Sequence, residues 1–134
     1  MAQLDFLVLC ESFAVDQATN RLSIFNIVET TVVAGFPVAI PSLAILTVWM
    51  RENGDESADF QCRVRLTTPG GANHDIRSNF QLTGPRHRIM QVVQGLQIER
   101  QGDLVAEVFL NEVSVCVRRI NISAGDTPPV TSVP

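Results

Sequence analysis

Apolar residues recur at every second position along much of this chain. Between residues 59 and 67, Phe60, Cys62, Val64 and Leu66 alternate with polar or charged residues, and a similar alternation runs from 75 to 83. A period of two sends alternate side chains to opposite faces of an extended ribbon, so both segments are predicted to be half-buried β-strands. Since no long stretch has the 3.6-residue period of an amphipathic helix, we predict an all-β protein.

The turn-forming residues divide the chain into eight predicted strands. Their ranges are 4–13, 21–30, 43–51, 59–67, 75–83, 88–98, 104–110 and 113–122. Seven or more short strands with regular turns favour a single-domain antiparallel β-sandwich, immunoglobulin-like or C2-like in kind. We expect this sandwich domain to span residues 1–123, and residues 124–134, rich in Pro, Ser and Thr, to form a disordered tail.

The alternation also predicts the register of two hairpins. With Gly71 at the centre of its connection, the first hairpin places Cys62 opposite Phe80 and Arg65 opposite Arg77. With a two-residue turn at Asn111-Glu112, the second hairpin pairs apolar residues throughout: Leu110 with Val113, Val108 with Val115, and Ala106 with Val117. Both hairpins would then bury one face each, as a sandwich requires.

One segment is apolar on both faces. Residues 30–50 carry no charge, and this uncharged run is long enough to span a membrane as a helix. However, Gly35, Pro37 and Pro41 would interrupt such a helix. A buried strand entered through a kink at Phe36-Pro37 and Pro41 explains the run better, so we expect no membrane span. A strand that is apolar on both sides must be covered on both, either within the sandwich or by a second subunit.

Composition excludes several functions. The net charge of −4 argues against a nucleic-acid partner, and the absence of lysine excludes Schiff-base chemistry. Cys10, Cys62 and Cys116 form no CxxC pair, which favours buried free thiols in a cytoplasmic protein, although a Cys62–Cys116 bridge stays possible. The N-terminus lacks the basic region of a signal peptide, which supports the cytoplasmic interpretation.

No catalytic or cofactor-binding pattern is present. The chain lacks HExxH, GxSxG, P-loop and GxGxxG motifs, and its two histidines, His74 and His87, have no sequence partners that would make a metal site. Cys10 and Glu11 are adjacent on a strand and point to opposite faces, so they do not cooperate readily. We therefore predict a protein that is not an enzyme and that needs no cofactor or metal.

Three arginines form the most distinctive polar cluster. Arg63, Arg65 and Arg77 lie on the two strands of the first hairpin. Like charges facing one another are unfavourable, so a carboxylate such as Asp59, Asp75 or Glu107 is expected to intervene and give a solvated mixed face. The alternative is a docking surface for an anion or an acidic partner.

The function predicted from these features is protein–protein contact or self-association. Phe25, Trp49 and Arg51 are the expected interface anchors, because the segment from Leu43 to Met50 and the pair Phe25/Ile27 supply more apolar surface than one small core requires. The alternative function is a carrier whose strands close into a barrel around a small apolar ligand.

A resemblance covers about a third of the chain. Cys10-Glu11-Ser12, Asp16, the run from Thr19 to Glu29, Phe36-Pro37 and Ile40-Pro41 resemble a family of small uncharacterised bacterial all-β proteins, a domain of unknown function. The resemblance implies a compact bacterial β-domain without an established activity. It assigns no functional residue.

Overall fold

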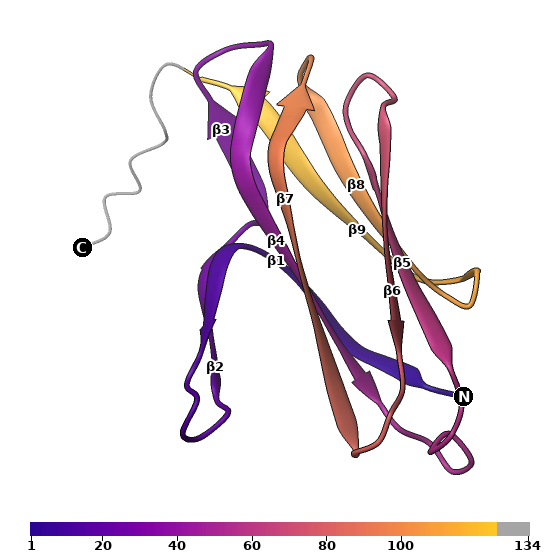
Figure 1. The fold of residues 1–134 in the computed structure, drawn as a ribbon. Coiled ribbons are helices and arrows are strands. Elements are labelled where there is room, and N and C mark those ends of the chain that lie inside the picture. The colour runs from indigo at the N-terminus through magenta and orange to yellow at the C-terminus, as the bar shows by residue number, and fades with distance from the viewer. Residues whose placement is uncertain (126–134) are drawn as a thin grey trace.

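The structure is a computed structural model and describes residues 1–125. These residues form nine strands and no helix (Figure 1). The strands are β1 (Gln3–Val15), β2 (Leu22–Ile27), β3 (Thr30–Val33), β4 (Val38–Met50), β5 (Phe60–Thr67), β6 (Asn73–Phe80), β7 (Arg86–Ile98), β8 (Gly102–Leu110) and β9 (Val113–Ala124). Within these residues no helix has the length and apolarity needed to cross a membrane.

The strands form two separate sheets, which confirms the predicted all-β sandwich. One sheet has the order β2-β1-β4-β7 and the other β3-β9-β8-β5-β6. The alternative of strands closed into a barrel is therefore wrong. The short strand β3 was missed, and it pairs with β9 in parallel, so the sandwich is not wholly antiparallel. A four-residue strand carries too little alternation to be recognised in sequence.

The predicted boundary of the C-terminal tail needs a small correction. Ala124 is the last residue of β9, and the backbone N–H of Gly125 donates to the carbonyl oxygen of Val33 at 3.1 Å. The ordered domain therefore extends to residue 125, because β3 supplies a partner for the end of β9. The rest of the predicted tail, residues 126–134, lies outside the described part of the chain.

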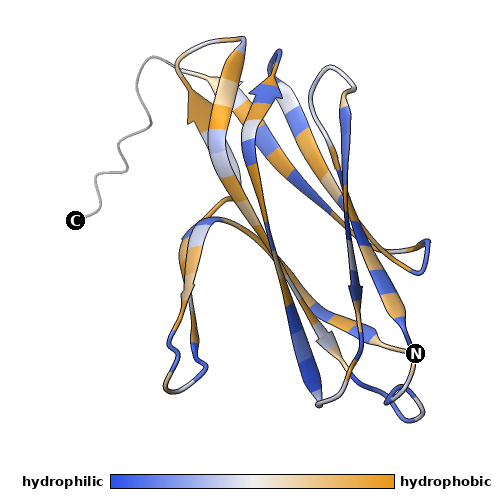
Figure 2. Cartoon of the chain, viewed as in Figure 1, coloured by the Kyte–Doolittle hydropathy of each residue, from blue (hydrophilic) through white to orange (hydrophobic). Residues whose placement is uncertain are grey.

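The main core lies between the sheets and is built by the alternating residues. Bands of hydrophobic and hydrophilic residues succeed one another along the strands in Figure 2. The largest fully buried side chains include Trp49, Leu66, Leu82, Leu104 and Ile120. Burial of each such side chain contributes roughly 1.5–3 kcal/mol.

A second apolar layer lies on the other face of β4. Leu46 and Val48 are buried although they alternate with the core residues of that strand. The β1–β2 hairpin reaches this face, since Leu22 and Ile24 line the same shallow hollow as Val48. The guanidinium of Arg88 on β7 donates to the backbone oxygen of Asn20 at 2.7 Å and ties the hairpin tip down. The chain itself covers this doubly apolar strand, so its burial requires no second subunit.

The entry to β4 shows why proline is tolerated inside it. The Phe36–Pro37 peptide bond is cis, and β4 begins at Val38, earlier than the predicted Leu43. Pro41 lies where β4 pairs with β7 alone, since pairing with β1 begins at Ala44. A residue without an N–H fits at such a half-paired position.

The β5–β6 hairpin is shifted by two residues from its predicted register. Phe80 lies opposite Phe60 rather than Cys62, and Arg65 faces Asp75 rather than Arg77. The connection is centred on Gly70 because Gly70 and Gly71 both adopt positive φ, at 116° and 93°. A shift of two keeps every side chain on its predicted face, so the core residues were still identified correctly.

The β8–β9 hairpin differs from its prediction through one extra residue. Asn111 and Glu112 form the expected turn, with φ of 48° and 68°, and Leu110 pairs with Val113 as predicted. The register then shifts between Val108 and Phe109, which leaves Val115 without a partner on β8. A bulge of one residue exchanges the two faces of the strand beyond it. The predicted pairs Val108–Val115 and Ala106–Val117 are therefore absent.

Candidate interaction surface

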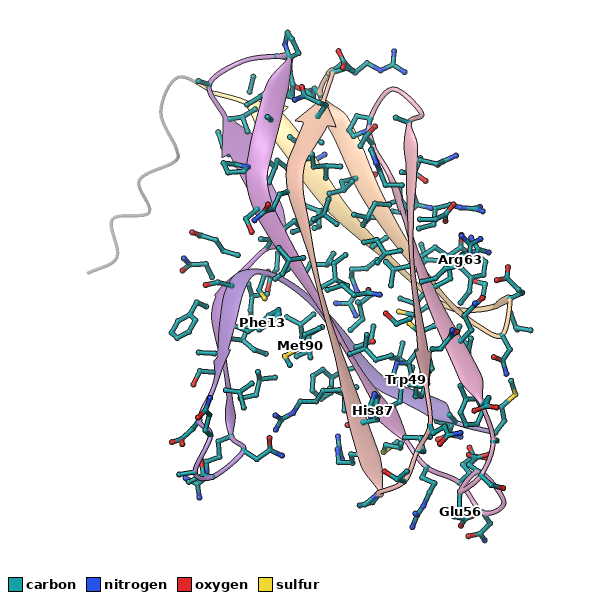
Figure 3. The ribbon with its side chains drawn as sticks, in the orientation of Figure 1. Phe13, Trp49, Glu56, Arg63, His87 and Met90 are labelled. Atoms are coloured by element: carbon teal, nitrogen blue, oxygen red, sulfur yellow. The ribbon has the colours of Figure 1, made fainter. Side chains whose placement is uncertain are left out.

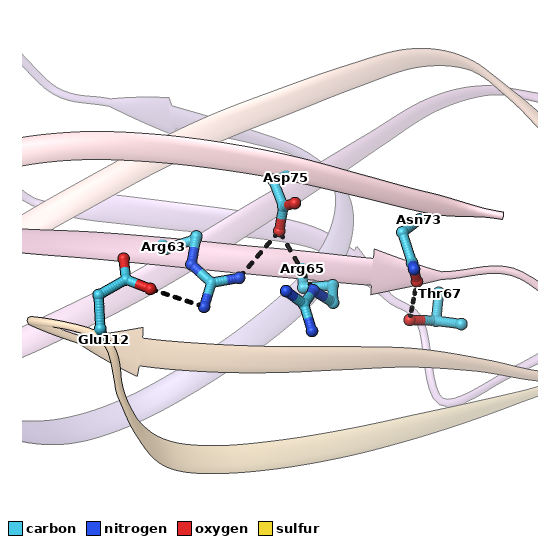
Figure 4. Close-up of polar contacts among 6 residues, drawn as sticks. All are labelled: Arg63, Arg65, Thr67, Asn73, Asp75 and Glu112. Atoms are coloured by element: carbon cyan, nitrogen blue, oxygen red, sulfur yellow. Dashed lines mark hydrogen bonds and ion pairs between the residues drawn. The ribbon is translucent and has the colours of Figure 1, made fainter. Parts of the chain in front are cut away.

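A buried arginine organises the outer face of the five-stranded sheet. The guanidinium of Arg63 on β5 lies 3.8 Å from the centre of the Phe109 ring on β8, and its side chain is only 7% exposed. Its two terminal nitrogens donate to Asp75 Oδ1 at 3.1 Å and Glu112 Oε2 at 3.0 Å (Figure 4). Stacking on an aromatic ring and pairing with two carboxylates compensate the cost of burying the charge.

The other two predicted arginines lie beside it in different environments. Arg65 Nε donates to the same Asp75 oxygen at 3.3 Å, and its guanidinium lies 5.5 Å from the Phe109 ring centre. Arg77 is exposed opposite Arg63 and makes no salt bridge within residues 1–125. The expected mixed face is therefore present, with Asp75 as one intervening carboxylate and Glu112, which the sequence did not suggest, as the other.

Asp75 makes this cluster sensitive to acid. Burial alone would raise its pKa, but the hydrogen bonds and charges of Arg63 and Arg65 outweigh burial and hold the pKa below its ordinary value of 3.8. A carboxylate with a lowered folded-state pKa stabilises the fold above its unfolded pKa, and this stabilisation is lost as pH falls through the folded-state pKa.

We therefore expect Asp75→Asn to lower the free energy of unfolding at pH 6 and to have a smaller effect at pH 3, below the ordinary pKa of the carboxyl group. Urea unfolding of both proteins at the two pH values measures this difference. Glu56→Gln is the control, because Glu56 is exposed and makes no salt bridge within the described residues. An effect of Asp75→Asn that is the same at both pH values would contradict the assignment.

A row of exposed valines lies on β9 of the same sheet. Val115 and Val117 form this row on the outer face of β9 and are 44% and 48% exposed, whereas Val113, before the bulge, pairs with the core residue Leu110 and lies on the other face. One edge of β9 pairs with β8, and the other pairs with β3 only from Asn121 to Ala124. Within the described residues the second edge is therefore unpaired from Val113 to Ile120, and we call this stretch the open edge of β9. Its backbone N–H and C=O groups are free to pair with another strand.

The valine row and the arginine cluster are adjacent across the hairpin. Phe109, whose ring lies under the guanidinium groups of Arg63 and Arg65, pairs with Ser114. Ser114 Oγ donates to Glu107 Oε2 at 2.6 Å. Val117 pairs with Glu107. An apolar strip beside stacked arginines has the composition of a protein interface, where apolar residues and arginine are enriched. Sequence reasoning missed the valines because it placed them in the core.

The three predicted interface anchors do not form one surface. Phe25 on β2 is 48% exposed, and Arg51 is exposed at the end of β4, where it donates to the Thr83 carbonyl oxygen at 3.3 Å. Trp49 is fully buried between the sheets (Figure 3). Its ring centre lies 5.6 Å from that of Phe80, and its Nε1 donates to Thr47 Oγ1 at 3.1 Å. The prediction for Trp49 is wrong, because it occupies a core position of β4.

The groups considered for catalysis are dispersed. His74 is exposed, whereas His87 is stacked on Phe80 with ring centres 5.2 Å apart. All three cysteines are free thiols, and burial raises the pKa of Cys62 to about 11, which disfavours a reactive thiolate. Within residues 1–125 no three His, Cys, Asp or Glu side chains are grouped to hold a metal ion.

Comparison with known proteins gives a family but no activity. No curated protein matches the chain. The model of a family described as a family of unknown function, DUF6941, matches residues 5–123, which is nearly the whole described domain. The matched region includes both sheets, the arginine cluster and the open edge of β9. The chain therefore belongs to this family of unknown function.

Proposed function

We propose that this protein is a non-enzymatic binding domain that acts through protein–protein contact, and that its first partner is a second copy of itself. The observation that carries the proposal is the row of exposed valines on the open edge of β9. An unpaired apolar edge is a template for the addition of another strand, and natural proteins commonly protect such edges with charges, proline or covering loops. Here the outer face of the edge carries Val115 and Val117, and its charged residues, Arg118 and Arg119, follow directly after them.

Symmetry favours a second copy as the occupant of this edge. Two identical strands that meet edge to edge in antiparallel orientation are related by a twofold axis, so the same residues contact one another from both sides. Two valine rows would then cover each other, and two five-stranded sheets would join into one continuous sheet. Arg118 and Arg119, exposed on the same edge, would form a polar margin of the contact.

The cellular setting is part of the proposal. A net charge of −4 supports a protein partner rather than a nucleic acid. Three free cysteines, two of them buried, are compatible with the reducing cytoplasm of a bacterium.

Sedimentation equilibrium over a wide concentration range tests the proposal. We expect the wild-type chain to form a reversible dimer, and Val117→Lys to raise the dimer dissociation constant at least roughly tenfold, because a lysine on the edge strand opposes strand pairing. Val92→Lys is the matched control. Val92 is similarly exposed, at 52% against 48% for Val117, but lies on β7 of the other sheet.

Two results would overturn the proposal. A wild-type chain that stays monomeric at all concentrations would exclude self-association. Equal weakening by Val92→Lys and Val117→Lys would place the contact elsewhere or show that it is unspecific.

A further inference from the structure

A cavity of about 400 Å³ lies between the two sheets, away from the arginine cluster. Its lining comes from both sheets and from the connection that precedes β3. The residues are Glu11, Val28, Thr31, Ile40, Pro41, Ser42, Leu43, Leu104, Ile120 and Ile122. This volume falls within the range of small-molecule pockets and is well above the roughly 150 Å³ of an apolar cavity that admits benzene.

The lining changes from apolar to polar between its floor and its rim. Its floor is formed by half-buried Val28 and Ile40 and by Pro41, and the fully buried Leu43, Leu104, Ile120 and Ile122 lie beneath them. The walls are half-buried and the rim includes the exposed side chain of Glu11. A site with a hydrocarbon floor and a single ionisable group at its mouth suits a molecule that is apolar at one end and charged at the other.

The rim carboxylate determines the sign of that charge. Glu11 Oε2 accepts a hydrogen bond from Asn26 Nδ2 at 2.9 Å, so the carboxylate is held by the β1–β2 hairpin. Within residues 1–125 Glu11 makes no salt bridge, and no lysine, arginine or histidine lines the cavity. The carboxylate is therefore the only charged group in the lining, and an ammonium group complements it.

We propose that this cavity binds a small aliphatic amine, with its hydrocarbon chain on the floor and its ammonium group hydrogen-bonded to Glu11. The site does not depend on self-association through β9, because the cavity is not lined by the valine row. An alkyl chain gains affinity by leaving water, about fourfold for each buried methylene. The ammonium adds a charge-assisted hydrogen bond at a partly exposed position, which we expect to be worth about fivefold in affinity.

Titration calorimetry with hexylamine, hexan-1-ol and ethylamine tests the site directly. We expect hexylamine to bind saturably at one site, hexan-1-ol to bind about fivefold more weakly, and ethylamine to show no measurable binding. Glu11→Gln keeps an oxygen for Asn26 but removes the charge, so it should reduce the affinity for hexylamine to that for hexan-1-ol. Glu29→Gln is the matched control, since Glu29 is exposed nearby but does not line this cavity.

A second variant separates the cavity from an unspecific surface. Ser42→Phe places a ring in the cavity wall and should abolish binding of both six-carbon probes, while thermal unfolding shows whether the variant is folded. Absence of saturable binding of hexylamine to the wild type would overturn the proposal. Equal affinities of hexylamine and hexan-1-ol, or an unchanged preference in Glu11→Gln, would overturn the role of the carboxylate.

Discussion

Replacement of Trp49 with alanine is expected to lower the free energy of unfolding by about 4 kcal/mol. Trp49 has no exposed surface, and its ring lies near that of Phe80 within the core. The substitution leaves a large cavity that the two surrounding sheets cannot close. Since small domains have a total stability of about 5–15 kcal/mol, the variant should be near the limit of folding. Guanidinium unfolding measures the effect.

Phe25→Ala is the control for this prediction. Phe25 is about half exposed on β2, so we expect its substitution to change the free energy of unfolding by no more than about 1 kcal/mol. A loss as large as that in Trp49→Ala would mean that Phe25 is covered in solution. A loss below 1 kcal/mol in Trp49→Ala would contradict its place in the core.

Leu46→Ala is expected to cost about 3 kcal/mol, which tests the second apolar layer. Leu46 is fully buried although it lies outside the main core cluster, on the face of β4 that the β1–β2 hairpin reaches. If the hairpin covers this face in solution, Leu46 behaves as a core residue. Urea unfolding, monitored by tryptophan fluorescence, gives the change in stability.

Two further variants locate the source of that cost. Val92→Ala alters an exposed residue of the neighbouring strand and should cost less than about 1 kcal/mol. Arg88→Ala removes the hydrogen bonds to Asn20 and should destabilise the hairpin without forming a core cavity. A cost of Leu46→Ala as small as that of Val92→Ala would show that the hairpin leaves this face uncovered.

The alternation of residues was sufficient to predict the fold class and most strands. It identified β5, β7 and β8 within two residues of their ends, and it placed Phe60, Val64 and Leu66 in the core. Alternation reports the face of a side chain but not its partner along the neighbouring strand. The alternation therefore could not reveal that the β5–β6 register is shifted by two residues at Gly70-Gly71, although this shift places Asp75 opposite Arg65.

The candidate site depended on two features that a single sequence does not reveal. The bulge at Val115 exchanges the faces of β9 beyond it and exposes Val115 and Val117, which alternation assigns to the core. The β1–β2 hairpin covers the second apolar face of β4 only because it folds back over the sheet, and this contact depends on the tertiary structure. Trp49 and Phe25 are both large and apolar, and only their positions in the sheets distinguish a core residue from a surface one.

The hairpin that covers β4 also has a consequence for synthesis on the ribosome. Residues 3–27 leave the exit tunnel before residues 38–50, so the β1–β2 hairpin is synthesised before β4, the strand that it covers. Nascent chains that display two-sided apolar strands are prone to aggregate, and domains generally fold as their N-terminal parts emerge. This order of elements shortens the time for which the second face of β4 meets water.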